Sequence, residues 1–274
     1  MSSPPSVRRS QLAPANGMAT VHLLEVEPDL GRDLDSEQWS AARQLRLPVQ
    51  TVSSDGADVD ATLVEARAFG ALVLEGMLAR RIRVDDHAAL RLLGPGDIYL
   101  LGAEPASALL AQSNCSAVAG TRLALLNNDL LVATYRWPRL VAGLLRRVAE
   151  QGERTSLQLA VGHLPRVDER LLAMFELIAE QWGVVTQHGR MIRLALTHET
   201  LGGLVGARRS TVSLALRTLA DRDELIRTDD GWLLRHDVTA RRLDLLQEPR
   251  TSAGTGPSAG SGEDHPTPVL RGRT

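Results

Sequence analysis

The sequence THETLGGLVGARRSTVSLALRTL, residues Thr197–Leu219, predicts two short helices joined by a tight turn. Thr197 suits the N-cap of the first helix, because its hydroxyl can accept a hydrogen bond from a free backbone N–H of the first turn. Gly206 can adopt the left-handed conformation that ends a helix, and a second helix then begins near Arg209. This order is typical of a helix-turn-helix, although an ordinary helical hairpin with a solvated face has the same pattern.

The second helix has an apolar side and a polar side. The apolar side consists of Val212, Ala215, Leu216 and Leu219. The opposite side consists of Ser210, Ser213, Leu214 and Arg217, which are polar except for Leu214. An apolar stripe at helical spacing predicts burial of that side. The exposed side has short side chains and arginines near its N-terminal end, which suits entry into the major groove of DNA.

A predicted β-hairpin follows the two helices. Its strands are Leu225 to Thr228 and Trp232 to Arg235, and Asp229-Asp230-Gly231 between them is a strong tight-turn signal. Helix, turn, helix and hairpin in this order predict a winged helix, which makes DNA binding more credible than the two helices alone do.

Composition sets broad limits on the function. The chain has 274 residues, enough for two modest domains, and a net charge of −2. All 31 basic residues are arginine, so any phosphate contact falls to guanidinium groups, which can bind bidentately. The charge balance is −7 over residues 21–130 and +2 over residues 131–248. The half with the helix-turn-helix is therefore the less repelled by DNA.

The sequence predicts no metal, cofactor or catalytic site. Cys115 is the only cysteine, which excludes an intramolecular disulfide and cysteine-ligated zinc or iron–sulfur centres. The seven histidines are scattered without ligand spacing. The acidic residues between Glu27 and Glu37 are interpreted as a solvated face. We see no signal peptide and no apolar run long enough for a bilayer, so we expect a cytoplasmic protein that is not an enzyme.

The N-terminal half predicts an antiparallel roll or barrel. A short helix is expected over Ser36 to Gln44, and from Val49 to about Leu126 the pattern favours short strands separated by tight turns. The strongest of these turns is Gly94-Pro95-Gly96-Asp97. Asn127-Asn128-Asp129 then marks a change to helix.

A long helix is predicted from Trp137-Pro138 to about Val161. Residues at alternating spacings of three and four form a weak heptad seam on it: Leu145, Val148, Gly152, Thr155 and Leu159. This seam predicts a dimer helix, and a single amphipathic helix packed on its own domain is the alternative. A further helix is expected over Leu171 to Trp182.

The predicted organisation has five parts. They are a disordered lead over 1–18, a β-roll domain over 19–136, a connecting and dimerisation helix over 137–163, a winged helix-turn-helix domain over 164–246, and a disordered tail over 247–274. The fold class is α+β, with an N-terminal jelly-roll-like antiparallel β-roll.

Residues 21–245 resemble the Crp/Fnr family of bacterial transcription regulators. The most specific part is the stretch from Leu201 to Ser213. The turn Leu93-Gly94-Pro95-Gly96-Asp97 is similar to a turn of the family's β-roll, and Leu164 to Leu172 resembles the segment that opens its DNA-binding domain. The resemblance implies a homodimeric regulator that binds double-stranded DNA, with RNA polymerase as a further candidate partner. It implies too that the β-roll over 19–136 is a cyclic-nucleotide-binding-like sensor domain.

The resemblance also implies roles for single residues. Arg209 matches the arginine at the start of the recognition helix, whose fork pairs with guanine O6 and N7. The other base-reading positions are Ser210, Ser213 and Leu214. The phosphate-contacting positions are Thr197, His198, Arg208, Thr211 and Arg217. Ser210 stands where the family's pattern has an acid and Leu214 where it has a second reading arginine, so the operator sequence is not predicted.

The roll departs further from cyclic-nucleotide-binding members. In those members a Gly-Glu pair follows the Gly-Asp turn, whereas here Ile98-Tyr99 follows Gly96-Asp97. No arginine that could pair with the phosphate occurs between Asp97 and Cys115. We therefore predict no cyclic-nucleotide binding, and haem ligation by a histidine stays open. Two alternatives remain: a small-molecule-binding or cupin-like roll, disfavoured because residues 60–126 contain only His87, and a protein-interaction module whose winged helix does not bind DNA.

Overall fold

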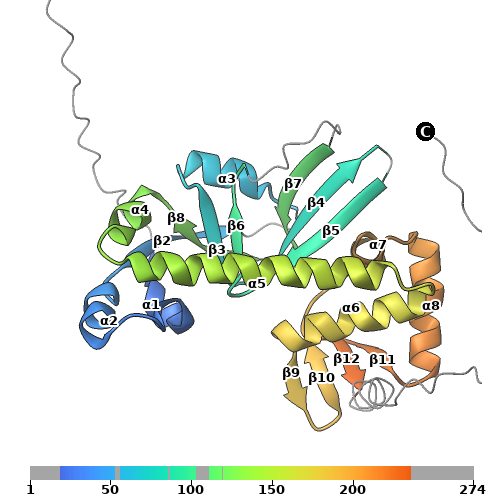
Figure 1. Ribbon diagram of the computed structural model, residues 1–274. Coiled ribbons are helices and arrows are strands. Elements are labelled where there is room, and N and C mark those ends of the chain that lie inside the picture. Colours follow the sequence, from blue (N-terminus) through green and yellow to red (C-terminus); the bar gives the residue numbers. More distant parts are fainter. Residues whose placement is uncertain (1–18, 53–55, 86, 103–110, 119, 236–274) are drawn as a thin grey trace, which may run out of the picture.

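The computed structural model of the protein describes residues 19–52, 56–85, 87–102, 111–118 and 120–235. The predicted terminal segments, 1–18 and 247–274, lie outside these residues. The N-terminal half is an antiparallel roll of two sheets (Figure 1). One sheet has the order β1-β2-β8-β3-β6 and the other β5-β4-β7. The strands are β1 (Thr20–His22), β2 (Arg46–Val52), β3 (Gly70–Glu75), β4 (Leu78–Val84), β5 (His87–Leu93), β6 (Ile98–Leu100), β7 (Ala111–Ala117) and β8 (Thr121–Leu126).

One helix interrupts the stretch from Val49 to Leu126, for which the sequence pattern favours strands. Residues Val59–Glu65 form α3, and the Asp58 side chain caps it by accepting a hydrogen bond from the Ala61 N–H (3.1 Å). Val59 and Leu63 are fully buried in the core shared by the two sheets. Apolar residues four apart and an aspartate N-cap are the local signals for this helix, which the expectation of strands overlooked.

Short helices accompany the strands of the roll. They are α1 (Leu23–Val26), the 3-10 helix η1 (Pro28–Gly31), α2 (Ser36–Ala42) and α4 (Asn128–Thr134). Of these, α1, α2 and α4 lie together at one end of the roll (Figure 1). Helix α2 lies where a helix was expected. The Asn127 side chain caps α4 by accepting from the N–H groups of Asp129 and Leu130, as the sequence indicated.

The long helix α5 (Pro138–Gly162) lies along the roll and grips it with polar side chains on one face (Figure 1). The buried amide of Gln151 accepts from the N–H of Ile98 and donates to the carbonyl of Ile98, each at 3.1 Å. Arg147 donates to the carbonyl of Gly96 (2.7 Å), and Gln158 donates to the carbonyl of Leu90 (2.9 Å). These contacts fix α5 on the backbone of β5, β6 and the turn between them.

The turn that α5 grips carries a buried carboxylate. Asp97 accepts from the N–H of Gly94 (3.0 Å) and pairs with Arg154 of α5. Burial raises the pKa of Asp97, and the nearby Arg154 opposes that shift. The Gly-Pro-Gly-Asp turn of the sequence is therefore the point where roll and helix are joined electrostatically.

The C-terminal half is a winged helix. Its elements are α6 (Val167–Trp182), β9 (Val184–Thr186), β10 (Gly189–Ile192), α7 (His198–Val205), α8 (Arg209–Asp221), β11 (Leu225–Thr228) and β12 (Gly231–Arg235). The four strands form one sheet in the order β11-β12-β10-β9. The wing predicted after α8 is thus the edge of a larger sheet, because the hairpin β9–β10 pairs with it.

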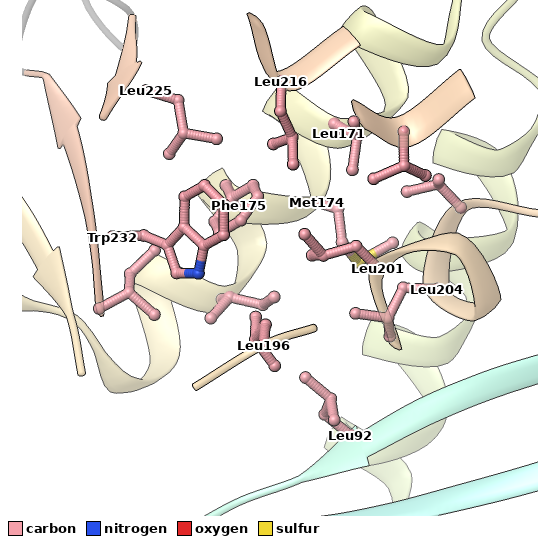
Figure 2. Close-up of a cluster of buried hydrophobic side chains, with 14 of the residues drawn as sticks. Leu92, Leu171, Met174, Phe175, Leu196, Leu201, Leu204, Leu216, Leu225 and Trp232 are labelled. Atoms are coloured by element: carbon pink, nitrogen blue, oxygen red, sulfur yellow. The ribbon is translucent and has the colours of Figure 1, made fainter. Parts of the chain in front are cut away.

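One apolar core joins the winged helix to the roll (Figure 2). Its centre is Phe175 of α6, whose ring centroid lies 5.1 Å from that of Trp232 on β12. Leu92 of β5 reaches the same cluster from the roll. The roll and the winged helix therefore pack against each other through a shared apolar core. Within the described part of the chain, no helix has both the length and the apolar character needed to cross a membrane.

The contact between α5 and η1 can be tested at a glycine. A Cβ at Gly143 would lie 2.3 Å from the Leu30 carbonyl oxygen. We expect Gly143→Ala to lower the free energy of unfolding. A Cβ this close to a backbone oxygen puts the cost of overpacking at the upper end of about 1–3 kcal/mol, above the gain of about 1 kcal/mol in helix propensity. Chemical denaturation followed by circular dichroism measures the change. Gly162→Ala is the control, since open space surrounds Gly162, and unchanged stability of Gly143→Ala would contradict this packing.

Candidate nucleic-acid interface

The turn between α7 and α8 has the geometry that the sequence predicts. The Thr197 hydroxyl caps α7 by accepting from the Thr200 N–H (3.1 Å). Gly206 ends the helix in the left-handed conformation (φ 62°, ψ 43°), and the Ala207 N–H then bonds to the Gly202 carbonyl (2.9 Å). A side chain at Gly206 would be strained at this φ. The turn therefore sets the angle at which α8 leaves α7.

Helix α8 is divided as the sequence predicts. The buried residues are Val212, Ala215, Leu216 and Leu219. The exposed residues are Arg208, Arg209, Ser210, Thr211, Ser213, Leu214 and Arg217. Leu214 is 64% exposed, so its side chain is free for a contact outside the protein and does not pack in the core. All the predicted base-reading residues thus share one outward surface.

One hydrogen bond ties the start of α7 to α8. The Nδ1 atom of His198 lies 2.8 Å from the hydroxyl of Ser213, which also donates to the Arg209 carbonyl (3.0 Å). A serine hydroxyl has one hydrogen to donate, so both contacts form together when His198 Nδ1 carries a hydrogen. Ser213 therefore orients His198 and the first turn of α8, and its oxygen is already engaged in the free protein.

The arginines of this surface keep their charge uncompensated. Among the described residues, Arg208, Arg209 and Arg217 form no ion pair. By contrast, Arg222, which follows the C-terminus of α8, pairs with Asp168 (3.2 Å). The exposed side of α8 therefore carries a positive charge that no described residue neutralises.

A hollow of about 740 Å³ lies between the start of α7, α8 and the wing. It brings together four predicted site residues: Thr197, His198, Arg209 and Arg217. Ser210, Thr211, Ser213 and Leu214 lie on the exposed side of α8 without lining this hollow. Three guanidinium groups and one carboxylate, Glu199, line it, so its charge favours an anion.

Sequence reasoning missed an arginine of the hollow. Arg227 of β11 lines it and stacks on Trp232, with its guanidinium carbon 4.7 Å from the centre of the ring. The pairing of Thr228 with Gly231 fixes the hairpin register and places Arg227 opposite Trp232. The Asp-Asp-Gly turn signal, read together with this register, could have identified the pair.

The predicted dimer residues lie on a different surface, along α5. Leu145 and Leu159 are 64% and 66% exposed, and Val148 is 39% exposed. Thr155 is half-buried, and its hydroxyl donates to the Gln151 carbonyl (2.9 Å). Leu157, which the seam does not include, is exposed as well. An apolar row therefore remains uncovered on the helix that grips the roll.

The comparisons with known proteins identify the fold. No protein-family model and no curated protein matches the chain. A mutant of CooA from Carboxydothermus hydrogenoformans has a TM-score of 0.57 and 18% identity, covering 83% of this chain and 97% of that one. FixK2 from Bradyrhizobium japonicum also has a TM-score of 0.57 and 18% identity, and the match covers 73% of this chain and 98% of that one. A cyclic nucleotide-binding domain containing protein from Listeria monocytogenes EGD-e has 0.54 and 16%, covering 70% and 90%.

These structures and this one have the same class of fold. A β-roll, a long helix and a C-terminal winged helix make up a Crp/Fnr-like fold, as the sequence resemblance implies. At identities of 18% and below, the likeness establishes the fold and leaves the function of this chain to its own residues.

A buried carboxylate links the start of α6 to the residue that follows α8. Asp168, in the first turn of α6, accepts two hydrogen bonds from Arg166 (2.8 and 3.1 Å) and one from Arg222 (3.2 Å). The hydrogen bonds from Arg166 hold the pKa of Asp168 below its usual value. The link stabilises the position of α8 relative to α6.

This link predicts a pH-dependent loss of stability. Asp168→Asn should lower the free energy of unfolding by about 1–3 kcal/mol near neutral pH, because charge-assisted hydrogen bonds are lost. The folded pKa is lowered, so the stabilisation is present above the usual aspartate pKa of about 4 and is lost as the pH falls through the folded value. Urea denaturation across this range should show the two proteins converging in acid. Asp221→Asn, at an exposed carboxylate, is the control.

Proposed function

We propose that the protein is a sequence-specific DNA-binding transcription regulator that acts as a homodimer and has no enzymatic activity. The observation that carries this proposal is the exposed side of α8, where Arg208, Arg209 and Arg217 form no ion pair with any residue that the structure describes. The buried side anchors the helix in the core (Figure 2). A rigid helix with a free cationic face is what major-groove recognition requires.

We assign contacts with bases or with phosphates to each residue of this surface from its position on α7 or α8. Arg209 opens α8, so we assign it to a guanine at the floor of the groove, with Ser210, Ser213 and Leu214 beside it. Contacts with the phosphates of the DNA backbone would come from Thr197, His198, Arg208, Thr211 and Arg217. Leu214 is suited to a thymine methyl because it is apolar and exposed.

The roll, residues 19–136, would be the sensor, residues 137–163 the dimer helix and residues 164–246 the DNA-binding domain. We propose that the effector is not a cyclic nucleotide. The buried Val59 and Leu63 of α3 pack between the sheets with Tyr99 and Cys115. Within the described part of the roll, this interior also holds the half-buried Arg80, whose guanidinium carbon lies 6.0 Å from the centre of the Tyr99 ring. A carboxylate, Asp60, accepts a hydrogen bond from the Tyr99 hydroxyl, and its negative charge opposes the binding of a cyclic phosphate there.

Genome-wide footprinting in the source organism tests the function and yields the operator. A gel shift against the protein's own upstream region, at stated salt, separates DNA binding from the protein-interaction alternative, for which the exposed Leu214 is the favouring observation. Once an operator is known, binding to RNA polymerase and activation or repression of transcription can be measured on it. Failure to recover any enriched site would overturn the proposal.

The two arginines at the start of α8 should behave differently. Arg209→Ala should lose about 1–3 kcal/mol of discrimination between the operator and single-base variants. Arg208→Ala should weaken binding to all sequences similarly and reduce the slope of log K against log salt by about 1. Fluorescence anisotropy with operator and mutated duplexes measures both. If Arg209→Ala binds its operator normally, the assignment of the recognition helix is wrong.

The exposed row on α5 should mediate the dimer. Burying one leucine contributes roughly 1.5–3 kcal/mol, so Leu145→Asp with Leu159→Asp should raise the dimer dissociation constant at least about 10-fold. Sedimentation equilibrium measures this, and operator affinity should fall in parallel because two half-sites are read together. Val64→Asp on α3 is the matched control, since Val64 is also 64% exposed. An unchanged dimer in the double variant would place the interface elsewhere.

A further inference from the structure

The first strand of the wing carries an arginine held in a defined position. Arg227 of β11 lies directly opposite Trp232 of β12. Its guanidinium stacks on the indole, and its Nη1 atom donates to the Leu196 carbonyl (3.3 Å). The indole itself is 3% exposed and packs on Phe175 in the core. The buried Trp232 therefore orients the exposed Arg227, and most N–H groups of the Arg227 guanidinium remain available for another partner.

The charge of Arg227 is not neutralised within the protein. The other arginine of the hairpin, Arg235, donates two hydrogen bonds to the Asp223 carboxylate (2.9 and 3.1 Å). Arg227 forms no ion pair among the residues that the structure describes. The hairpin thus has one paired and one unpaired arginine, and only the unpaired one lines the hollow.

The hollow gives Arg227 a common target with the recognition helix. Arg209 and Arg217 of α8 line the same space, together with the cap residue Thr197. Guanidinium groups from two elements that face one hollow favour a phosphodiester, because each group can offer two parallel N–H donors to phosphate oxygens. Strand β11 follows α8 after a three-residue connection, and both elements border this hollow.

The tip of the wing has the opposite charge. Asp229 and Asp230 are exposed at the turn and form no ion pair among the described residues. Two carboxylates repel phosphates at close range. A contact between this wing and DNA therefore falls on the strand and not on the turn.

We propose that Arg227 binds a phosphate of the DNA backbone flanking the groove that α8 enters, with Trp232 as its positioning residue. This inference rests on the proposed function and adds to it a backbone contact outside the helix-turn-helix. Because a phosphate contact carries no base information, Arg227 sets affinity and the position of the wing without changing the sequence that is read.

The test is the salt dependence of binding to a fluorescein-labelled operator duplex recovered by footprinting, with a scrambled duplex alongside. Arg227→Gln should reduce the slope of log K against log salt by about 0.9, the value expected for one lost phosphate contact. Arg227→Met, whose alkyl chain still covers Trp232, should do the same. Arg227→Lys should restore the slope. Preference for the operator over its single-base variants should stay unchanged in all three.

Arg235→Gln is the matched control: it removes an arginine of the same hairpin that is already paired, and should leave the slope unchanged. Thermal melts verify that each variant folds. If wild-type protein binds no duplex, the proposed function fails. If it binds and both uncharged variants at position 227 keep the wild-type slope, only this inference fails. A slope that rises when Asp229 and Asp230 are both changed to Asn, with no effect at Arg227, would place the turn against the DNA instead.

Discussion

The whole arrangement depends on the buried amide of Gln151. Its oxygen and nitrogen satisfy both backbone groups of Ile98 at the centre of the contact between α5 and the roll. An unpartnered amide at this depth would be costly, so the pair permits one register of the helix on the roll. Arg147 and Arg154, one turn to each side, extend the same register to Gly96 and Asp97. That register leaves the apolar row of α5 outside, and α6, the first helix of the winged helix, follows from the end of α5.

The second junction, between the roll and the winged helix, has a different physical character. Leu90 and Leu92 of β5 enter the core that contains Leu204 of α7, and a Cβ at Gly203 would lie 3.0 Å from the Leu90 Cβ. Apolar contact is non-directional, so it holds the two surfaces together without fixing a register. Strand β5 therefore has a hydrogen bond to α5 through the Leu90 carbonyl and apolar contacts with α7 through its side chains. It is the element through which the roll contacts both helices.

Local chemistry determined which parts could be predicted from the sequence. Thr197 as a cap, Gly206 as a left-handed stop and the turn ending at Asp97 each act within a few residues, and the structure confirms them. Helix α3 was missed because its apolar residues were attributed to strands. The grip of Gln151 and the stacking of Arg227 on Trp232 depend on residues distant in the chain or on exact register, which periodicity alone does not contain.

The net charge of −2 is a poor guide to this molecule because its arginines fall into two populations. One population is spent on structure: Arg147, Arg154 and Arg222 each face a carboxylate at a junction between elements. The other, which includes Arg209 and Arg217 of α8 and Arg227 of β11, forms no ion pair among the described residues. Pairing cancels the field of the first group, so the potential near the hollow is set by the second. A chain that is slightly acidic overall can therefore present a cationic surface, and the burial and pairing of each arginine decide where that surface lies.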